Sequence, residues 1–265
     1  DWPLAYGQLN PPRWYLIENI RTEHGHRLVA AVVAMATIVL GLRIRRFERR
    51  PWVRKMGAAA VGLVALQALA GGLRVLRLSI DLAMVHGWLA QMFFALVVAI
   101  ATVTAPGWHQ GQAAVSSRIG RIAAAALVVV TSQLVAGLLV RHLSANQGSL
   151  ATAGVFHLHV VLAAVILWLT VHMKRIVGRE GRSAPIILPI RALPPLVSLQ
   201  MGLGIASFAI VENMAFDRQA NFLESWLPTM HVAAGAAILA LCVTVAIRAF
   251  ASSTAAAKAQ RPPHR

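Results

Sequence analysis

Long, uninterrupted apolar runs alternate with short polar connections along the chain. Seven of these runs approach the length of about 20 residues that a helix needs to cross the hydrocarbon core of a bilayer. They occupy 25–42, 56–75, 84–103, 122–140, 151–171, 193–211 and 227–247. The runs are continuous, whereas the strands of a membrane barrel alternate apolar and polar positions. The pattern therefore predicts an all-α polytopic membrane protein.

The polar connections fall into two sets that differ in charge. The connections 43–55, 106–121 and 172–191, together with the tail after Ile247, hold 18 of the 25 Lys and Arg residues and only two acids. The other set begins at Asp1 and continues through 74–83, 141–150 and 212–226, and its seven basic residues are balanced by seven acids. Cytoplasmic connections are rich in Lys and Arg. We therefore expect the N-terminus outside and the C-terminus inside, which an odd number of spans requires.

Composition supports the same picture. Of the 265 residues, 58% are hydrophobic and 13% are charged, whereas soluble domains have about 25% charged residues. An ordinary soluble globule, a basic nucleic-acid-binding domain and a disordered chain are excluded, and the formal net charge of +16 points to a lipid bilayer as the partner. The single cysteine, Cys242, excludes an intramolecular disulfide and a thiolate metal cluster.

Histidines recur in four of the predicted spans, each followed four residues later by a small residue. The pairs are His26/Ala30, His86/Ala90, His159/Ala163 and His231/Gly235. Each histidine comes soon after the chain enters the membrane from outside, so all four are expected at similar depth. The spans between them share a second pattern, a glutamine followed four residues later by glycine: Gln67/Gly71, Gln133/Gly137 and Gln200/Gly204.

The spacing of these marks indicates an internal duplication. Gln67 and Gln200 are 133 residues apart, as are His26 and His159. We expect two pseudosymmetric four-helix bundles, with the counterpart of the Gln133 helix lying upstream of Asp1, so that seven helices of eight are present. The expected division is 1–115 for the first half, 116–250 for the second and 251–265 for a flexible basic tail.

The histidines suggest a pair of iron sites. Polar side chains inside a membrane are costly and mark function, and two imidazoles on facing helices can hold a haem iron from both sides. One pair would be His26 with His86, and the other His159 with His231. A non-haem metal site, and structural or proton-relay histidines, remain alternatives. The small residue one turn after each histidine fits a flat macrocycle, or simply close helix packing.

The two halves differ beside their first histidine. Glu23 and Arg27 in the first half align with Phe156 and Val160 in the second. An acid one turn before the first ligand suits a reactive site that handles protons or orients an oxygen species. The alternative is an interfacial carboxylate paired with Arg27. Candidate contacts for haem propionates are Arg27, Arg74, Arg77 and Arg141.

Several motifs together resemble the haem A synthase family, the membrane enzymes of cytochrome oxidase assembly. They are DWPLAYGQLNPP at 1–12, EHGHR at 23–27, QALAGGLRV at 67–75, HGWLA at 86–90, HLHVVLA at 157–163 and HVAAG at 231–235. The resemblance implies that His26 and His86 flank the substrate haem O beside an essential Glu23. It also implies that His159 and His231 ligate a resident haem b. The implied reaction oxidises a haem methyl to a formyl by two successive hydroxylations, giving haem A.

The resemblance implies an outside electron donor. A haem O synthase and further copies of the chain are candidate partners, and the expected location is the inner membrane of a bacterium rather than of a mitochondrion. The chain departs from the family pattern in lacking its first helix and the cysteine pair of some members, and in having His159-Val160 where His-Arg is common. Two other functions stay open: a two-haem electron-transfer cytochrome, and a non-enzymatic haem-binding assembly factor.

Overall fold

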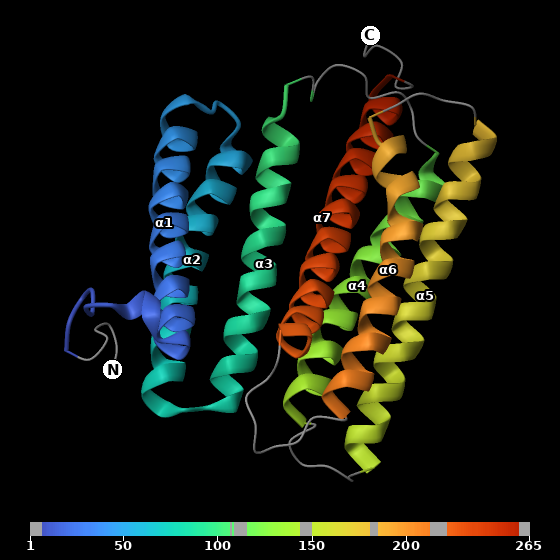
Figure 1. Ribbon diagram of the computed structural model, residues 1–265. Helices are drawn as coiled ribbons and strands as arrows, with labels where there is room; N and C mark the ends of the chain where they lie inside the picture. Colours follow the sequence, from blue (N-terminus) through green and yellow to red (C-terminus); the bar gives the residue numbers. More distant parts are fainter. Residues whose placement is uncertain are drawn as a thin grey trace. The chain divides into compact units, whose positions relative to one another are not determined.

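A computed structural model of the chain contains seven helices that are long and apolar enough to cross a membrane (Figure 1). It describes residues 7–106, 108, 116–143, 150–180, 185–212 and 222–259. The helices are α1 (Glu18–Phe47), α2 (Pro51–Arg77), α3 (Ile80–Thr104), α4 (Ser117–Leu143), α5 (Leu150–Glu180), α6 (Ile187–Glu212) and α7 (Phe222–Ala259), with a 3₁₀ turn η1 (Trp14–Leu16) before α1.

Each predicted apolar run lies within one of these helices. The prediction of an all-α multi-pass membrane protein is therefore confirmed, whereas the eighth helix and the orientation stay predictions. The first six residues of the opening motif and the last six of the basic tail lie outside the described residues.

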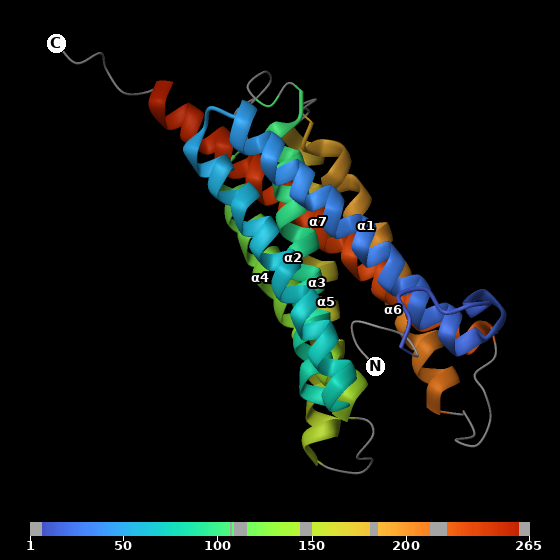
Figure 2. The ribbon, with the colours of Figure 1, turned by 90° about the vertical axis from the view of Figure 1, so that its left-hand side faces the viewer.

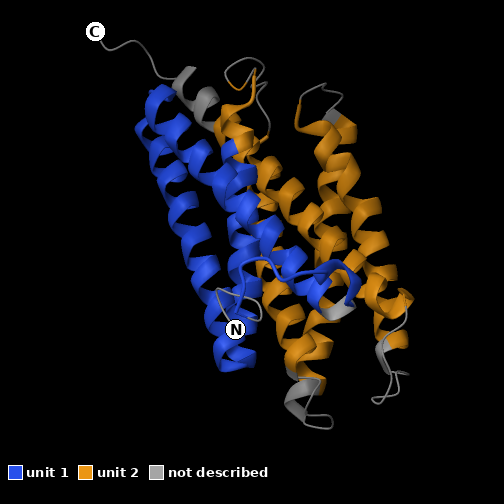
Figure 3. Ribbon diagram, turned by 60° about the vertical axis from the view of Figure 1, so that its left-hand side comes forward, with its two compact units in different colours: residues 1–100 blue, residues 101–265 orange. Residues whose placement is uncertain are grey.

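The chain divides into two compact units, shown in different colours in Figure 3. Unit 1 comprises Asp1–Ile100 and unit 2 comprises Ala101–Arg265, so the division falls near the end of α3. The expected boundary between residues 115 and 116 remains a prediction. Each unit contains one of the two predicted histidine pairs and is described below by itself.

Unit 2 contains a closed four-helix bundle. Helix α4 packs against α5 and α7, and α6 packs against the same two helices. The largest fully buried side chains of this unit are aliphatic or sulfur-containing, apart from one threonine: Ile119, Thr170, Met173, Ile190, Leu193, Leu239, Cys242 and Val245. Lipid tails are as apolar as these side chains, so close van der Waals packing rather than water exclusion favours the bundle. The buried Thr170 hydroxyl donates to the Leu167 carbonyl, which satisfies it within its own helix.

In unit 1, α1 and α2 pack closely at the end where they are joined. A Cβ added to Gly41 would lie 2.7 Å from Cγ2 of Val61, and one added to Gly57 would lie 3.0 Å from Cγ2 of Ile44. Small residues at these two positions therefore allow the helices to approach each other. Figure 2 shows the two helices splayed apart at the other end, where η1 lies. His26 belongs to this splayed end and is exposed.

The connections in unit 1 are defined by local polar contacts. Between α1 and α2, Arg50 binds the Glu48 carboxylate through its guanidinium at 2.7 Å and its backbone N–H at 2.9 Å. These hydrogen bonds lower the pKa of Glu48 to about 2. Pro51 begins α2, where its missing N–H costs nothing. At the other end, Leu78 adopts a left-handed conformation with φ of 49°, and the Ser79 hydroxyl accepts from the backbone N–H of Leu82 at the start of α3.

Candidate functional site

The first histidine pair lies in unit 1, between α1 and α3. The ring centroids of His26 and His86 are 6.4 Å apart and their planes are inclined by 74°. The two residues are 60 positions apart in the chain, and the fold brings them together as expected. Arg74, near the end of α2, lies close enough for its charge to act on His86.

The second pair lies in unit 2, between α5 and α7. The ring centroids of His159 and His231 are 6.3 Å apart and their planes are inclined by 58°. Both side chains are half-buried. The two units thus hold their histidine pairs at almost the same separation.

This separation suits two imidazoles that share one metal ion. A metal–imidazole bond is about 2 Å long, so two rings on opposite sides of one iron have centroids about 6 Å apart. Two axial ligands tolerate different ring inclinations, because each ring can rotate about its own metal–nitrogen bond. The residues present therefore fit a haem iron held from both sides in each unit.

Three of the four histidines contact the glutamine of the preceding helix. The amide nitrogen of Gln67 lies 3.5 Å from Nε2 of His86. The corresponding distances are 3.4 Å from Gln133 to His159 and 3.3 Å from Gln200 to His231. The backbone carbonyls of Gln67 and Gln200 also accept from Nδ1 of His86 and His231, each at 3.1 Å. The glutamines recur along the sequence, but that pattern alone did not reveal this role.

The glycine that follows each glutamine lies against the same imidazole. A Cβ added to Gly71 would lie 2.9 Å from Cε1 of His86, and one added to Gly204 would lie 2.9 Å from Cε1 of His231. For Gly137 and His159 the distance is 3.1 Å. Since Cβ atoms rarely approach other atoms this closely, the glycines leave room for the rings. The Gln-x-x-x-Gly segments therefore form a support for the ring, with hydrogen bonds on one turn and close contact on the next.

The two pairs differ in what surrounds them. In unit 1, Arg27 forms an ion pair with Glu23 one turn before it, and 58% of the Glu23 side chain is exposed. In unit 2, the aligned Phe156 lies against Phe208, with ring centroids 4.8 Å apart. A charged pair in one unit thus corresponds to an aromatic pair in the other. The ion pair between Glu23 and Arg27 agrees with the structural alternative, and a catalytic role for Glu23 remains a prediction.

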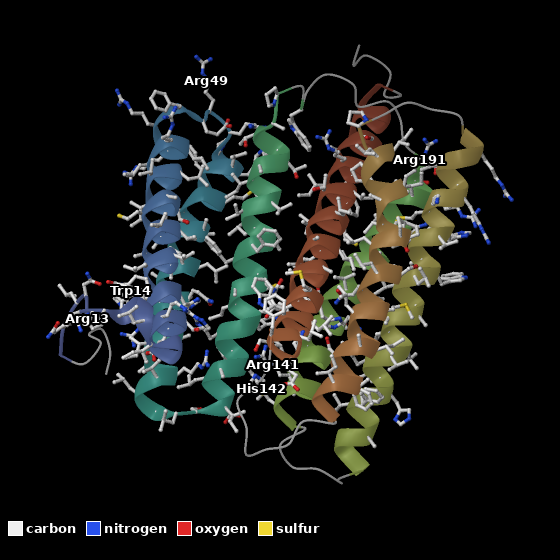
Figure 4. The ribbon with its side chains drawn as sticks, in the orientation of Figure 1. Arg13, Trp14, Arg49, Arg141, His142 and Arg191 are labelled. Carbon is white, nitrogen blue, oxygen red and sulfur yellow. The ribbon has the colours of Figure 1, made fainter. Side chains whose placement is uncertain are left out.

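The other candidate arginines are exposed at helix ends. Arg77 lies in the last turn of α2 and Arg141 in the last turn of α4. Figure 4 shows Arg141 beside His142 at one end of unit 2, with Arg191 at the opposite end. Among the described residues, no hydrogen bond or ion pair joins Arg77 or Arg141 to a paired histidine. Arg74, in contrast, lies close enough to His86 for its charge to act on that ring.

The structure adds one feature that the sequence did not predict. His24, near the start of α1, is buried against the segment that precedes this helix. Its Nε2 lies 3.1 Å from Oδ1 of Asn10, and the Trp14 ring meets it edge-on at a centroid distance of 5.0 Å. Trp14 appears at the start of α1 in Figure 4. No sequence pattern indicated this contact, because it joins a loop to a helix across irregular backbone.

A site built from three or more protein ligands finds no support in the part of the chain that the structure describes. No three His, Cys, Asp or Glu side chains come together there as metal ligands. Non-haem metal sites use three or four such ligands.

Comparisons of the chain with protein-family models, curated proteins and solved structures found no match. The functional argument therefore rests on the sequence motifs and on the geometry of the two histidine pairs.

Proposed function

We propose that this chain is a haem A synthase-like membrane oxidoreductase that converts haem O to haem A. The observation that carries the proposal is the pair of imidazoles in each unit, with ring centroids 6.4 Å and 6.3 Å apart. This separation suits two axial ligands of one iron. The motifs around the four histidines resemble those of the haem A synthase family, and the pairs formed are those that the resemblance implies.

In unit 1, His26 and His86 would bind the iron of the substrate haem O. Binding both faces of the substrate fixes the macrocycle plane and leaves its edge as the part that can vary. The guanidinium of Arg74 would pair with a propionate, and Arg27 would offer a second cation from α1. Glu23, one turn before His26 on the same face of α1, would move protons at the reacting edge.

In unit 2, His159 and His231 would hold a resident haem b. Such a haem supplies one-electron transfer. Phe156, one turn before His159 on α5, contacts Phe208 of α6, whereas the aligned position in unit 1 carries the charged Glu23. Apolar surroundings around one pair and ionisable surroundings around the other suit a division between electron transfer and chemistry.

The overall reaction would convert a methyl group of haem O to a formyl group. Each of two hydroxylations would consume one molecule of oxygen, two electrons and two protons, inserting one oxygen atom into a C–H bond and releasing the other as water. The resulting gem-diol would then lose water to give the formyl group. A haem O synthase would supply the substrate and an outside donor would supply the electrons. The multi-pass architecture places the protein in a membrane, and we propose the inner membrane of a bacterium.

The test is to express the full chain with haem O in a host that makes no haem A. The protein is purified in mild detergent, and its pigments are extracted and identified by mass. We expect haem b together with haem O, its hydroxylated form or haem A. Recovery of haem b alone, with haem O unchanged after incubation with a reductant and oxygen, would contradict the proposal.

A two-haem electron-transfer cytochrome is the second candidate, and the near-identical geometry of the two pairs favours it. Two equivalent carriers would need equal ligand separations, which the structure has. This candidate requires both haems to be resident and chemically unchanged. Exchange of added haem O into unit 1 but not into unit 2 would favour the synthase instead. An assembly factor that only carries haem would release it unaltered from either unit.

A further inference from the structure

The three glutamines of the Gln-x-x-x-Gly segments contact the nitrogen that an iron would need. Each side-chain amide lies 3.3–3.5 Å from Nε2 of its histidine. The contact repeats in both units, from α2 to α3, from α4 to α5 and from α6 to α7. The recurrence of this contact at three positions of a duplicated chain indicates a role at the histidines rather than chance packing.

The hydrogen bonds of two histidines establish which nitrogen carries the proton. In His86 and His231, Nδ1 lies 3.1 Å from the backbone carbonyl oxygen of the same glutamine. A carbonyl oxygen can only accept, so Nδ1 donates and Nε2 has a free lone pair. The glutamine NH₂ donates to that lone pair. The amide and an iron therefore compete for the same electron pair of the same atom.

The amides are held weakly. Nitrogen–acceptor distances in good hydrogen bonds are about 2.7–3.2 Å, so contacts of 3.3–3.5 Å are long. The oxygen atom of each of the three amides is also buried, with no hydrogen-bond partner among the described residues. A buried, unsatisfied oxygen raises the free energy of this arrangement. Displacing the amide from its histidine therefore costs little free energy.

In unit 2, the amide also occupies space beside the small residue. A Cβ added to Gly235 would lie 3.2 Å from Nε2 of Gln200. Gly235 is one turn beyond His231 on α7. Gln200 thus contacts Nε2 of His231 and also fills the space beside this glycine.

We propose that Gln67, Gln133 and Gln200 are positioning residues that act as placeholders. Each occupies Nε2 of its histidine when no iron is bound there, and each is displaced when iron binds. The proposal rests on the proposed function only in that the iron belongs to a haem. It assigns Gln67 and Gln200 two effects, selecting Nε2 as the ligand atom through their backbone carbonyls and lowering the net affinity for haem. It assigns Gln133 only the second effect, since Nδ1 of His159 has no hydrogen-bond partner among the described residues.

The test compares Gln200→Ala and Gln133→Ala with a matched control, Leu199→Ala, which removes an exposed side chain from the same helix as Gln200. The purified full chain, stripped of haem, is titrated with hemin in detergent. Losing one competing hydrogen bond should tighten binding about two- to tenfold, and Leu199→Ala should leave binding unchanged. Gln200→Asn is too short to reach Nε2 and should tighten binding as well, which covers the case in which Gln200→Ala does not fold.

A second measurement needs no haem. Nitrogen NMR of histidine-labelled protein should show His86 and His231 protonated at Nδ1, with the Nε2 resonance of His231 shifting in Gln200→Ala while its Nδ1 proton is kept. Weaker or unchanged hemin binding in the glutamine variants, when the wild type binds, would overturn the placeholder role and leave the proposed function intact. If the wild type itself binds no hemin, both fail.

Discussion

The two units hold their histidine pairs in the same way but surround them differently. The centroid separations of 6.4 Å and 6.3 Å differ by 0.1 Å, and in each unit the histidine on the second helix of the pair is supported by Gln-x-x-x-Gly on the helix before it. In contrast, a charged Glu23–Arg27 pair in unit 1 corresponds to the aromatic Phe156–Phe208 contact in unit 2. The arrangement of the paired histidines is therefore duplicated, and the residues around it are not.

The support of the first histidine is the other difference. His159 is contacted by Gln133 and lies close to Gly137, whereas His26 is exposed where α1 and α2 splay apart. The following variants test this contrast between the two units.

Removing one ligand from each unit should give the largest effects. His231→Ala should lose the haem b of unit 2, and His86→Ala should keep it while ending haem A formation. Changing a residue that merely hydrogen-bonds a metal ligand lowers metal affinity or activity about 10–100-fold. We therefore expect the haem b content of His231→Ala and the haem A formation of His86→Ala each to fall by more than about a hundredfold. Pyridine haemochrome spectra and mass analysis of extracted pigments measure both outcomes. If His86→Ala removes haem b instead, the assignment of the two units is reversed.

Glu23→Gln should separate chemistry from binding. The amide keeps the shape of the side chain but cannot take up a proton, so haem A formation should fall by about a hundredfold or more. The haem b spectrum should be unchanged, because Glu23 belongs to the other unit. Arg27→Gln breaks the same ion pair from the other side and also removes a candidate propionate contact, so its haem O binding is measured beside its haem A formation. Equal losses of haem A formation in both variants, with haem O binding unchanged, would favour a structural ion pair over a proton carrier.

The sequence predicted the helices well because each is specified locally. Every apolar run lies inside one helix, since a backbone crossing lipid must satisfy its own hydrogen bonds. The pairing of histidines was also predictable, because the 133-residue repeat assigned equivalent positions to both halves. The partners within each pair then followed from having two histidine helices per half.

The contacts of the glutamines and of His24 could not be predicted in the same way. The recurrence of Gln67, Gln133 and Gln200 was visible, but a period along one helix does not say which side chain it meets on the next. That depends on helix rotation, which small residues such as Gly71 control by allowing close approach. His24 is buried by Asn10 and Trp14 from a segment without apolar periodicity, so no helical pattern indicated it.

The glycines under the imidazoles should show how far the two units are alike. Gly71→Ala and Gly204→Ala each place a Cβ 2.9 Å from Cε1 of a histidine, and such overpacking costs about 1–3 kcal/mol. Gly62→Ala and Gly202→Ala lie on the same helices with nothing within 4 Å, so they serve as controls. These controls should stabilise their helices by up to about 1 kcal/mol. Unfolding midpoints and hemin affinity are measured, and equal losses in both units would confirm equivalent supports.

The smallest effect concerns the connection between α1 and α2, at the end of unit 1 away from the histidines, where Figure 4 shows Arg49. Arg50 lowers the pKa of Glu48 from 4.5 to about 2. A carboxyl whose pKa is lowered by folding stabilises the folded state above its unfolded pKa, and this contribution disappears as pH falls from about 4.5 towards 2. Glu48→Gln should therefore lower the unfolding midpoint slightly near neutral pH, and the difference from wild type should vanish in acid. Since exposed ion pairs contribute little, hemin binding by His26 and His86 should be unchanged. A loss of hemin binding would show instead that the connection between α1 and α2 sets the position of His26 at the opposite end of the two helices.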